Sequence, residues 1–181
     1  MAVSGIVGLF ASFVLSIEAW QLAQDSSTRF SCDISAVLSC SAVAQSWQAT
    51  LLGFPNAFLG ILFETVVLAV SVALIAGVRF PRWYMLCVEA LYSVGLFFAL
   101  WLFSQSYFVL HVLCPWCLLI TVTTTLVWAG LTRINIRQGI VPVPDFIRRM
   151  VHMGMDWAVT GLFLFILAAM VFARYGVYLL M

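Results

Sequence analysis

Residues 112–119 read VLCPWCLL, a Cys-X-X-Cys pair with apolar residues on both sides. The apolar run continues from this pair to Leu131. Pro115 suits the first position of a helix, where its fixed φ angle and its missing N–H cost nothing. The segment therefore predicts a helix that begins near Cys114, is apolar enough to cross a membrane, and carries two thiols at one end.

The composition agrees with a membrane protein. Of the 181 residues, 65% are apolar and 8% are charged, whereas roughly 25% of the residues of a soluble domain are charged. Apolar runs of spanning length cover residues 2–22, 54–78, 83–103, 112–131 and 157–178. We expect residues 104–111 to form a tight turn. The predicted fold is an all-α integral membrane protein, a four-helix transmembrane bundle plus a fifth transmembrane helix, in a lipid bilayer and without nucleic acid.

The first apolar run could instead be a secretory signal peptide. It lacks a basic segment at its start, and it has Glu18 and Trp20 where a cleavage site would have small residues. We therefore interpret it as a retained membrane span.

The arginines predict an orientation, because short cytoplasmic loops collect basic residues. Two arginines, Arg79 and Arg82, lie between runs two and three. Four more lie between runs four and five: Arg133, Arg137, Arg148 and Arg149. Arg29 and Arg174 lie on the other side. The amino terminus is thus expected to be cytoplasmic and the carboxyl terminus to be outside.

With this orientation, four of the cysteines face the outer compartment. Cys32 and Cys40 lie in the loop of residues 23–53, and Cys114 and Cys117 lie at the outer end of the fourth run. Cys87 is alone near the cytoplasmic side and is interpreted as a small buried apolar residue. Because thiols in an oxidising compartment persist as disulfides or exchange sites, two pairs on one membrane face favour redox chemistry.

The two cysteines of the motif differ in their expected surroundings. Cys114, at the positive end of the helix dipole, is favoured as a thiolate. Cys117 lies one turn deeper, with Thr121 a further turn along the same face. This arrangement suits electron transfer from an aqueous thiol to a lipid-soluble acceptor, for which a quinone is the obvious candidate.

Other interpretations stay open. The motif could form a structural disulfide, four cysteines could hold zinc, and the protein could be a non-enzymatic scaffold or a metal-handling protein. A c-type haem is excluded, because Leu118 stands where the motif requires histidine. We expect no metal.

Together these motifs resemble the vitamin K epoxide reductase family, in its bacterial branch. The resemblance rests on Cys32 and Cys40 in the outer loop, on CPWC opening the fourth helix, and on FPNAFLG at residues 54–60. It covers residues 1–131 and implies a four-helix catalytic core around a quinone site. Residues 132–156 would be a cytoplasmic linker and residues 157–181 a fifth transmembrane helix, without a fused thioredoxin domain. The expected location is a bacterial inner membrane.

The resemblance also implies roles for the cysteines. Cys117 would react with the quinone ring and Cys114 would be its exchange partner. Cys40 would exchange with Cys114, and Cys32 would meet a separate thioredoxin-like thiol protein. The protein would thus be a disulfide-forming oxidoreductase that passes electrons to menaquinone, ubiquinone or a vitamin K type quinone.

The quinone site is less fully matched by the resemblance. Asn56 corresponds to a donor to a quinone carbonyl, whereas Thr121 stands in place of the second donor, a tyrosine. Residues 41–52 predict a short amphipathic helix on the membrane surface. Trp47 and Trp116 could form a lid over the quinone, although interfacial tryptophans are more often anchors.

Carboxylic acids inside the spans require an explanation, because a charge in lipid is expensive. Glu18, Glu64 and Glu89 lie within apolar runs. They could relay protons to the quinone, but a structural role, protonated or paired with arginine, is favoured. His111 is expected to end the turn before the motif. The threonines of the fourth run are expected to bond to carbonyls of their own helix.

Overall fold

The structure is a computed structural model that describes residues 1–25, 28–30, 32–35 and 37–180. Five of its helices are long and apolar enough to cross a membrane. They are α1 (Ala2–Gln24), α3 (Ala57–Ile75), α4 (Arg82–Ser104), α5 (Pro115–Arg137) and α7 (Met155–Leu180). The described residues contain no β-strand, which confirms the predicted all-α membrane fold.

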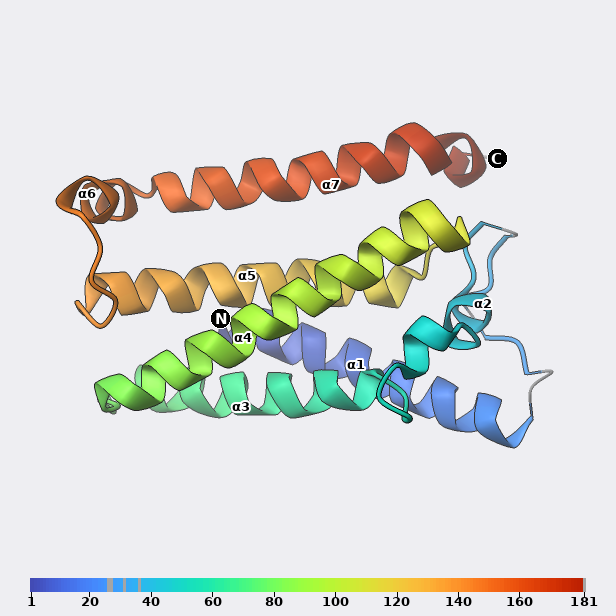
Figure 1. The fold of residues 1–181 in the computed structure, drawn as a ribbon, viewed down its shortest axis with the longest axis horizontal. Coiled ribbons are helices and arrows are strands. Elements are labelled where there is room, and N and C mark those ends of the chain that lie inside the picture. The colour runs from blue at the N-terminus through green and yellow to red at the C-terminus, as the bar shows by residue number, and fades with distance from the viewer. Residues whose placement is uncertain (26–27, 31, 36, 181) are drawn as a thin grey trace.

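The first four of these helices form a bundle, and α7 lies along α5 on its outer side (Figure 1). Helix α1 packs along α3 and α5, and α4 packs along α5, whereas α3 and α4 make few direct contacts. Val67, Met85, Val127 and Leu131 form a fully buried apolar core among these helices. Helices α3 and α4 therefore meet mainly through the side chains of this core.

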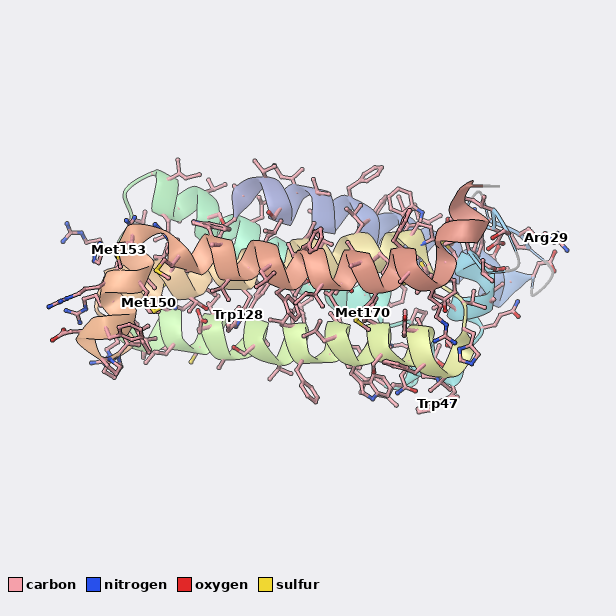
Figure 2. The ribbon with its side chains drawn as sticks, turned by 90° about the horizontal axis from the view of Figure 1, so that it is seen from above. Arg29, Trp47, Trp128, Met150, Met153 and Met170 are labelled. Atoms are coloured by element: carbon pink, nitrogen blue, oxygen red, sulfur yellow. A yellow bond between two sulfur atoms is a disulfide. The ribbon has the colours of Figure 1, made fainter. Side chains whose placement is uncertain are left out.

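The connections gather at the two ends of the bundle. The short helix α6 (Asp145–Met153) lies at one end, where Figure 2 places Met150 and Met153. The other end holds α2 (Cys40–Ala44), and Figure 2 places Arg29 and Trp47 there. Both cysteine pairs come from segments at this second end, as the topology predicted.

The turn predicted at residues 104–111 is wrong. Helix α4 continues into a π-helical segment, η2 (Gln105–Leu110), so the third span extends over Arg82–Leu110. The polar residues at 104–106 suggested a break, but the segment ends in the apolar sequence YFVL and keeps helical hydrogen bonding. The chain turns at His111 instead, which has a left-handed φ of 57°.

The single helix predicted at residues 41–52 is also wrong. The segment forms α2 and then a separate 3₁₀ helix, η1 (Trp47–Thr50). The Ser39 hydroxyl accepts from the Ala42 N–H and caps the start of α2. After α2 the Ser46 hydroxyl donates to the Val43 carbonyl at 2.6 Å, and the backbone of Ser46 becomes extended. Residues 132–156, predicted to be a linker, contain the last turns of α5 and the whole of α6.

Several polar groups inside the bundle are hydrogen-bonded to other polar groups. The Glu89 carboxylate accepts from the Thr132 hydroxyl and, at 2.9 Å, from the Asn135 amide. As predicted, hydroxyls on α5 bond back to their own helix, with Thr121 donating to the Cys117 carbonyl and Thr125 to the Thr121 carbonyl. Such bonds satisfy polar side chains where water cannot.

Candidate active site

The Cys-X-X-Cys motif lies at the start of α5, where the sequence placed it. Cys114 is the N-cap residue and Pro115 is the first helical residue. The Cys114 sulfur accepts from the Cys117 backbone N–H at 3.3 Å. The sulfur therefore caps the N-terminus of α5, where it faces a backbone N–H donor.

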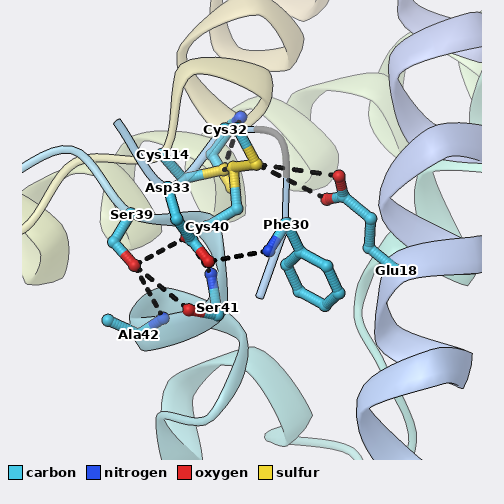
Figure 3. The surroundings of a disulfide bond; sticks show 10 residues. Glu18, Phe30, Cys32, Asp33, Ser39, Cys40, Ser41, Ala42 and Cys114 are labelled. Atoms are coloured by element: carbon cyan, nitrogen blue, oxygen red, sulfur yellow. Dashed lines mark hydrogen bonds between the residues drawn. A yellow bond between two sulfur atoms is a disulfide. The ribbon is translucent and has the colours of Figure 1, made fainter. Parts of the chain in front are cut away.

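The outer loop brings the second cysteine pair against the first. Cys32 and Cys40 form a disulfide, and the Cys114 sulfur lies 3.5 Å from the Cys40 sulfur (Figure 3). Cys40 is 1% exposed and Cys114 is 2% exposed. The two sulfurs are therefore in contact within a site that excludes bulk water.

Backbone pairing fixes this contact. The Leu113 N–H donates to the Val37 carbonyl at 2.9 Å, and the Ser39 N–H donates to the Leu113 carbonyl at 3.1 Å. Leu38 and Leu113 are thereby paired as in a parallel β-bridge. Leu113 directly precedes Cys114, and Leu38 lies two residues before Cys40, so the pairing sets the register between the two cysteine pairs.

Asp33 organises the loop around the disulfide. Its carboxylate accepts from the Phe30 N–H at 2.8 Å, the Ser41 N–H at 3.0 Å and the Ser39 hydroxyl at 2.8 Å (Figure 3). Burial alone would raise the pKa of Asp33, but these hydrogen bonds outweigh it and lower the pKa to about 2. Asp33 is therefore a charged acceptor that holds the loop together.

A cavity of about 400 Å³ lies between α3 and α4, beneath α2 and η1. Its walls are mostly apolar, with Leu59 and Phe63 from α3 and Phe98 and Leu102 from α4. The two cysteines of the motif and Cys40 also line it. The volume and lining suit a flat, apolar molecule beside the Cys117 sulfur.

Polar groups lie at the two ends of this cavity. At the outer end the Asn56 amide donates to the Gln48 backbone carbonyl at 2.6 Å. The buried side-chain oxygens of Asn56 and Gln48 have no hydrogen-bond partner among the described residues. At the inner end the Tyr92 hydroxyl donates to the Glu64 carboxylate at 2.9 Å. The cavity thus offers polar contacts at either end of an apolar chamber.

The predicted quinone-binding residues divide into two groups. Asn56 and Thr121 line the cavity, but the Thr121 hydroxyl donates to the Cys117 carbonyl at 2.9 Å. Trp47 and Trp116 do not line it, which corrects the predicted lid. Trp47 is 63% exposed and packs edge-on against Trp101, while Trp116 packs against Phe10 of α1.

The cap over the cavity comes from residues that the sequence did not single out. Gln48 is buried and lines the cavity where η1 crosses its outer end. Gln48 follows Trp47 in the 3₁₀ turn, so the Gln48 side chain faces the cavity and the Trp47 side chain faces away from it. Tyr92 was also missed, because an isolated tyrosine in a membrane span is ordinary.

The disulfide includes two of the three described residues that could hold a metal ion. The ligand atoms of Glu18, Cys32 and Cys40 lie within 4.8 Å of one another. In this structure the two sulfurs are bonded to each other, and zinc binds cysteine as the thiolate. In the state that the structure shows, these two sulfurs are therefore not thiolate ligands.

The fold and the site define a multi-pass membrane protein in which two cysteine pairs meet beside an apolar cavity. The sequence model of the Vitamin K epoxide reductase family matches residues 1–131, and the chain belongs to this family. It is accordingly a membrane thiol–disulfide oxidoreductase of a quinone-linked family. The search of curated proteins finds no match to the chain.

Proposed function

We propose that the protein oxidises a separate thioredoxin-like protein outside the cytoplasm and passes the electrons to a membrane quinone. The observation that carries this proposal is the 3.5 Å contact between the sulfurs of Cys40 and Cys114. It joins a disulfide in the outer loop to a dithiol beside an apolar cavity. Electrons can pass along such a chain only by exchange between adjacent sulfurs.

In the proposed path the reduced partner attacks the Cys32–Cys40 disulfide and leaves both as thiols. Cys40 then attacks the sulfur of Cys114 in an oxidised Cys114–Cys117 pair, and Cys117 leaves. Cys32 attacks Cys40, which restores the loop disulfide and releases Cys114. The observed state, with Cys32 bonded to Cys40 and with free thiols at Cys114 and Cys117, is the product of this transfer.

The cavity supports a quinone as the acceptor. A quinone in it would supply the capacity to take two electrons from the Cys114–Cys117 dithiol. The apolar walls would hold the ring and exclude water, and the Asn56 amide at the outer end would orient it. The cavity lies between α3 and α4, so entry from the lipid between these helices is the expected route. Menaquinone, ubiquinone and a vitamin K type quinone all fit this chemistry.

The proposed location is the inner membrane of a bacterium, with the cysteine pairs on the outer face. The arginines on the α6 side and the thiol chemistry at the opposite end support this orientation. Residues 1–131 would be the catalytic core, and residues 157–181 a fifth transmembrane helix beside it. The alternative, a scaffold or metal-handling protein with structural cysteines, would leave the contact between Cys40 and Cys114 without a role.

The proposal is tested by turnover. Purified protein is mixed with a reduced thioredoxin-like protein and a short-chain quinone, and quinone absorbance is followed. We expect Cys117→Ala to abolish quinone reduction and Cys87→Ala to keep it, because Cys87 does not line the cavity. Cys87 is exposed, not buried as predicted. Equal turnover by Cys117→Ala and the parent protein would refute the mechanism.

A further inference from the structure

Glu18 is a membrane carboxylate that the proposed electron path leaves without a role. It lies on α1, is 8% exposed, and points from that helix toward the loop disulfide (Figure 3). Its two carboxylate oxygens lie 3.6 and 3.8 Å from the Cys32 sulfur. A disulfide sulfur has no proton to donate, so this contact becomes an S–H···O hydrogen bond only when Cys32 is reduced.

Asp33 is a second carboxylate beside the disulfide among the described residues, and it is poorly suited to accept a proton. Three hydrogen bonds already satisfy its oxygens. No hydrogen bond or ion pair to Glu18, other than the contact with Cys32, is found in the described part of the chain. The titratable groups that face Glu18 are Cys32, Cys40 and Asp33 of the outer segment and Cys117 of α5. Glu18 is thus the carboxylate with free capacity at the reacting sulfur.

We propose that Glu18 is the catalytic base that deprotonates Cys32 when the loop disulfide is re-formed. The inference rests on the proposed function, because it concerns one step of that electron path. Thiolates, not thiols, attack disulfides, and Cys32 is only 6% exposed, so little water reaches it to take the proton. A carboxylate in contact with the sulfur can take it directly.

The step balances in protons and electrons. Cys40 attacks Cys114, the Cys114–Cys117 bond breaks, and the proton of Cys40 passes to Cys117. Cys32 then gives its proton to Glu18 and attacks Cys40, so that the Cys40–Cys114 bond breaks and the Cys32–Cys40 bond forms. Cys114 leaves as a thiolate, stabilised by the Cys117 N–H. Two electrons have moved from the loop pair to the pair on α5, and Glu18 returns its proton when the partner next releases Cys32.

A single-turnover experiment isolates this step. Protein with both pairs reduced is mixed without oxygen with excess short-chain naphthoquinone, while absorbance and site-resolved thiol alkylation are followed. The first equivalent of quinone oxidises the pair on α5. The second equivalent is consumed only after electrons have moved from Cys32 and Cys40, so its rate reports the exchange.

Glu18→Gln keeps the size and polarity of the side chain but cannot take the proton. We expect it to slow the second phase roughly 10²-fold, as for loss of a general base, and to change the first phase less than twofold. The matched control is Glu89→Gln, which makes the same change at a half-buried carboxylate bonded to Thr132 and Asn135. It should leave both phases unchanged.

The pH dependence separates catalysis from structure. Without a base, Cys32 must lose its proton to solvent, so the second phase of Glu18→Gln should accelerate about tenfold per pH unit in mildly alkaline solution. The parent protein should show a weaker dependence. If Glu18→Gln does not fold, Glu18→Asp, with its shorter reach, should slow the second phase severalfold.

The outcomes are distinct. A second phase as fast in these variants as in the parent, or the same pH dependence in both, overturns the role of Glu18. Loss of the first phase together with the second also overturns it, because the residue would then be structural. Failure of the parent protein to consume any quinone refutes the proposed function itself.

Discussion

The sulfur of Cys114 lies 3.5 Å from the sulfur of Cys40, although 74 residues separate them in the chain. The contact depends on the backbone pairing of Leu38 with Leu113, which holds the outer loop against the start of α5. It makes these two sulfurs the point where electrons would cross from loop to membrane helix.

The contact can be tested by leaving only these two cysteines at the site. In a protein carrying Cys32→Ser and Cys117→Ser, mild oxidation should form a Cys40–Cys114 disulfide, detected by mass spectrometry of unreduced peptides. The matched variant with Cys32→Ser and Cys114→Ser leaves Cys40 with Cys117 instead. We expect it to cross-link at least tenfold more slowly, and faster cross-linking there would contradict the proposed path.

The hydrogen bonds to the Asp33 carboxylate predict that acid destabilises the outer loop. Its pKa in the folded protein, about 2, lies below the ordinary value of 3.8, so its stabilising effect is complete above pH 4 and is lost as the pH falls toward 2. Because Asp33 is only partly buried and solvent screens it, we expect Asp33→Asn to cost about 1 kcal/mol at neutral pH. Thermal unfolding in detergent should show this difference shrinking between pH 4 and pH 2. A constant difference would show that the charge of Asp33 is unimportant.

Filling the cavity should block quinone without disturbing the loop. Ala99 lines the cavity on α4, and Ala99→Phe places a ring in it. We expect quinone reduction to fall at least tenfold, while the partner still reduces the Cys32–Cys40 disulfide at the parent rate. The control is Val94→Phe on the same helix, because Val94 is 65% exposed. Unchanged quinone reduction in Ala99→Phe would place the acceptor site elsewhere.

The packing of α1 against α3 requires glycine at position 60. A Cβ atom at Gly60 would lie 3.0 Å from the Cβ of Ser12 and closer still to its hydroxyl oxygen. Gly60→Ala should therefore destabilise the bundle by about 1–3 kcal/mol, the usual effect of overpacking. At Gly161 of α7 an added Cβ meets nothing within 4 Å, so Gly161→Ala should leave stability equal or slightly raised. Equal unfolding temperatures for the two variants would contradict this packing.

Sequence patterns predicted the features that depend on local chemistry. The apolar runs predicted the spans, and Pro115 after Cys114 predicted where α5 begins. The polar residues at 104–106 led to the wrong prediction of a turn. A helix can satisfy such side chains within its own turns, as Ser104 shows by donating to the Trp101 carbonyl. Local polarity therefore does not decide whether a membrane helix ends.

Features that depend on tertiary packing were beyond the sequence. Trp47 is an interfacial tryptophan in either interpretation, and only the turn of η1 shows that Gln48 faces the cavity instead. Glu18 stood out as an acid in a membrane span, but its contact with Cys32 depends on how the outer loop folds back over α1. Such relationships arise from chain segments that have no common sequence pattern.

The central claim is the order in which the cysteines lose their electrons. Fully reduced protein is given one equivalent of quinone without a thiol partner, and free thiols are labelled at intervals and located by mass spectrometry. We predict that Cys114 and Cys117 lose labelling first, that Cys32 and Cys40 follow as Cys114 and Cys117 regain it, and that Cys87 stays labelled throughout. Loss of labelling at Cys32 and Cys40 before Cys114 and Cys117, or no quinone-dependent loss at any of the four, would contradict the account.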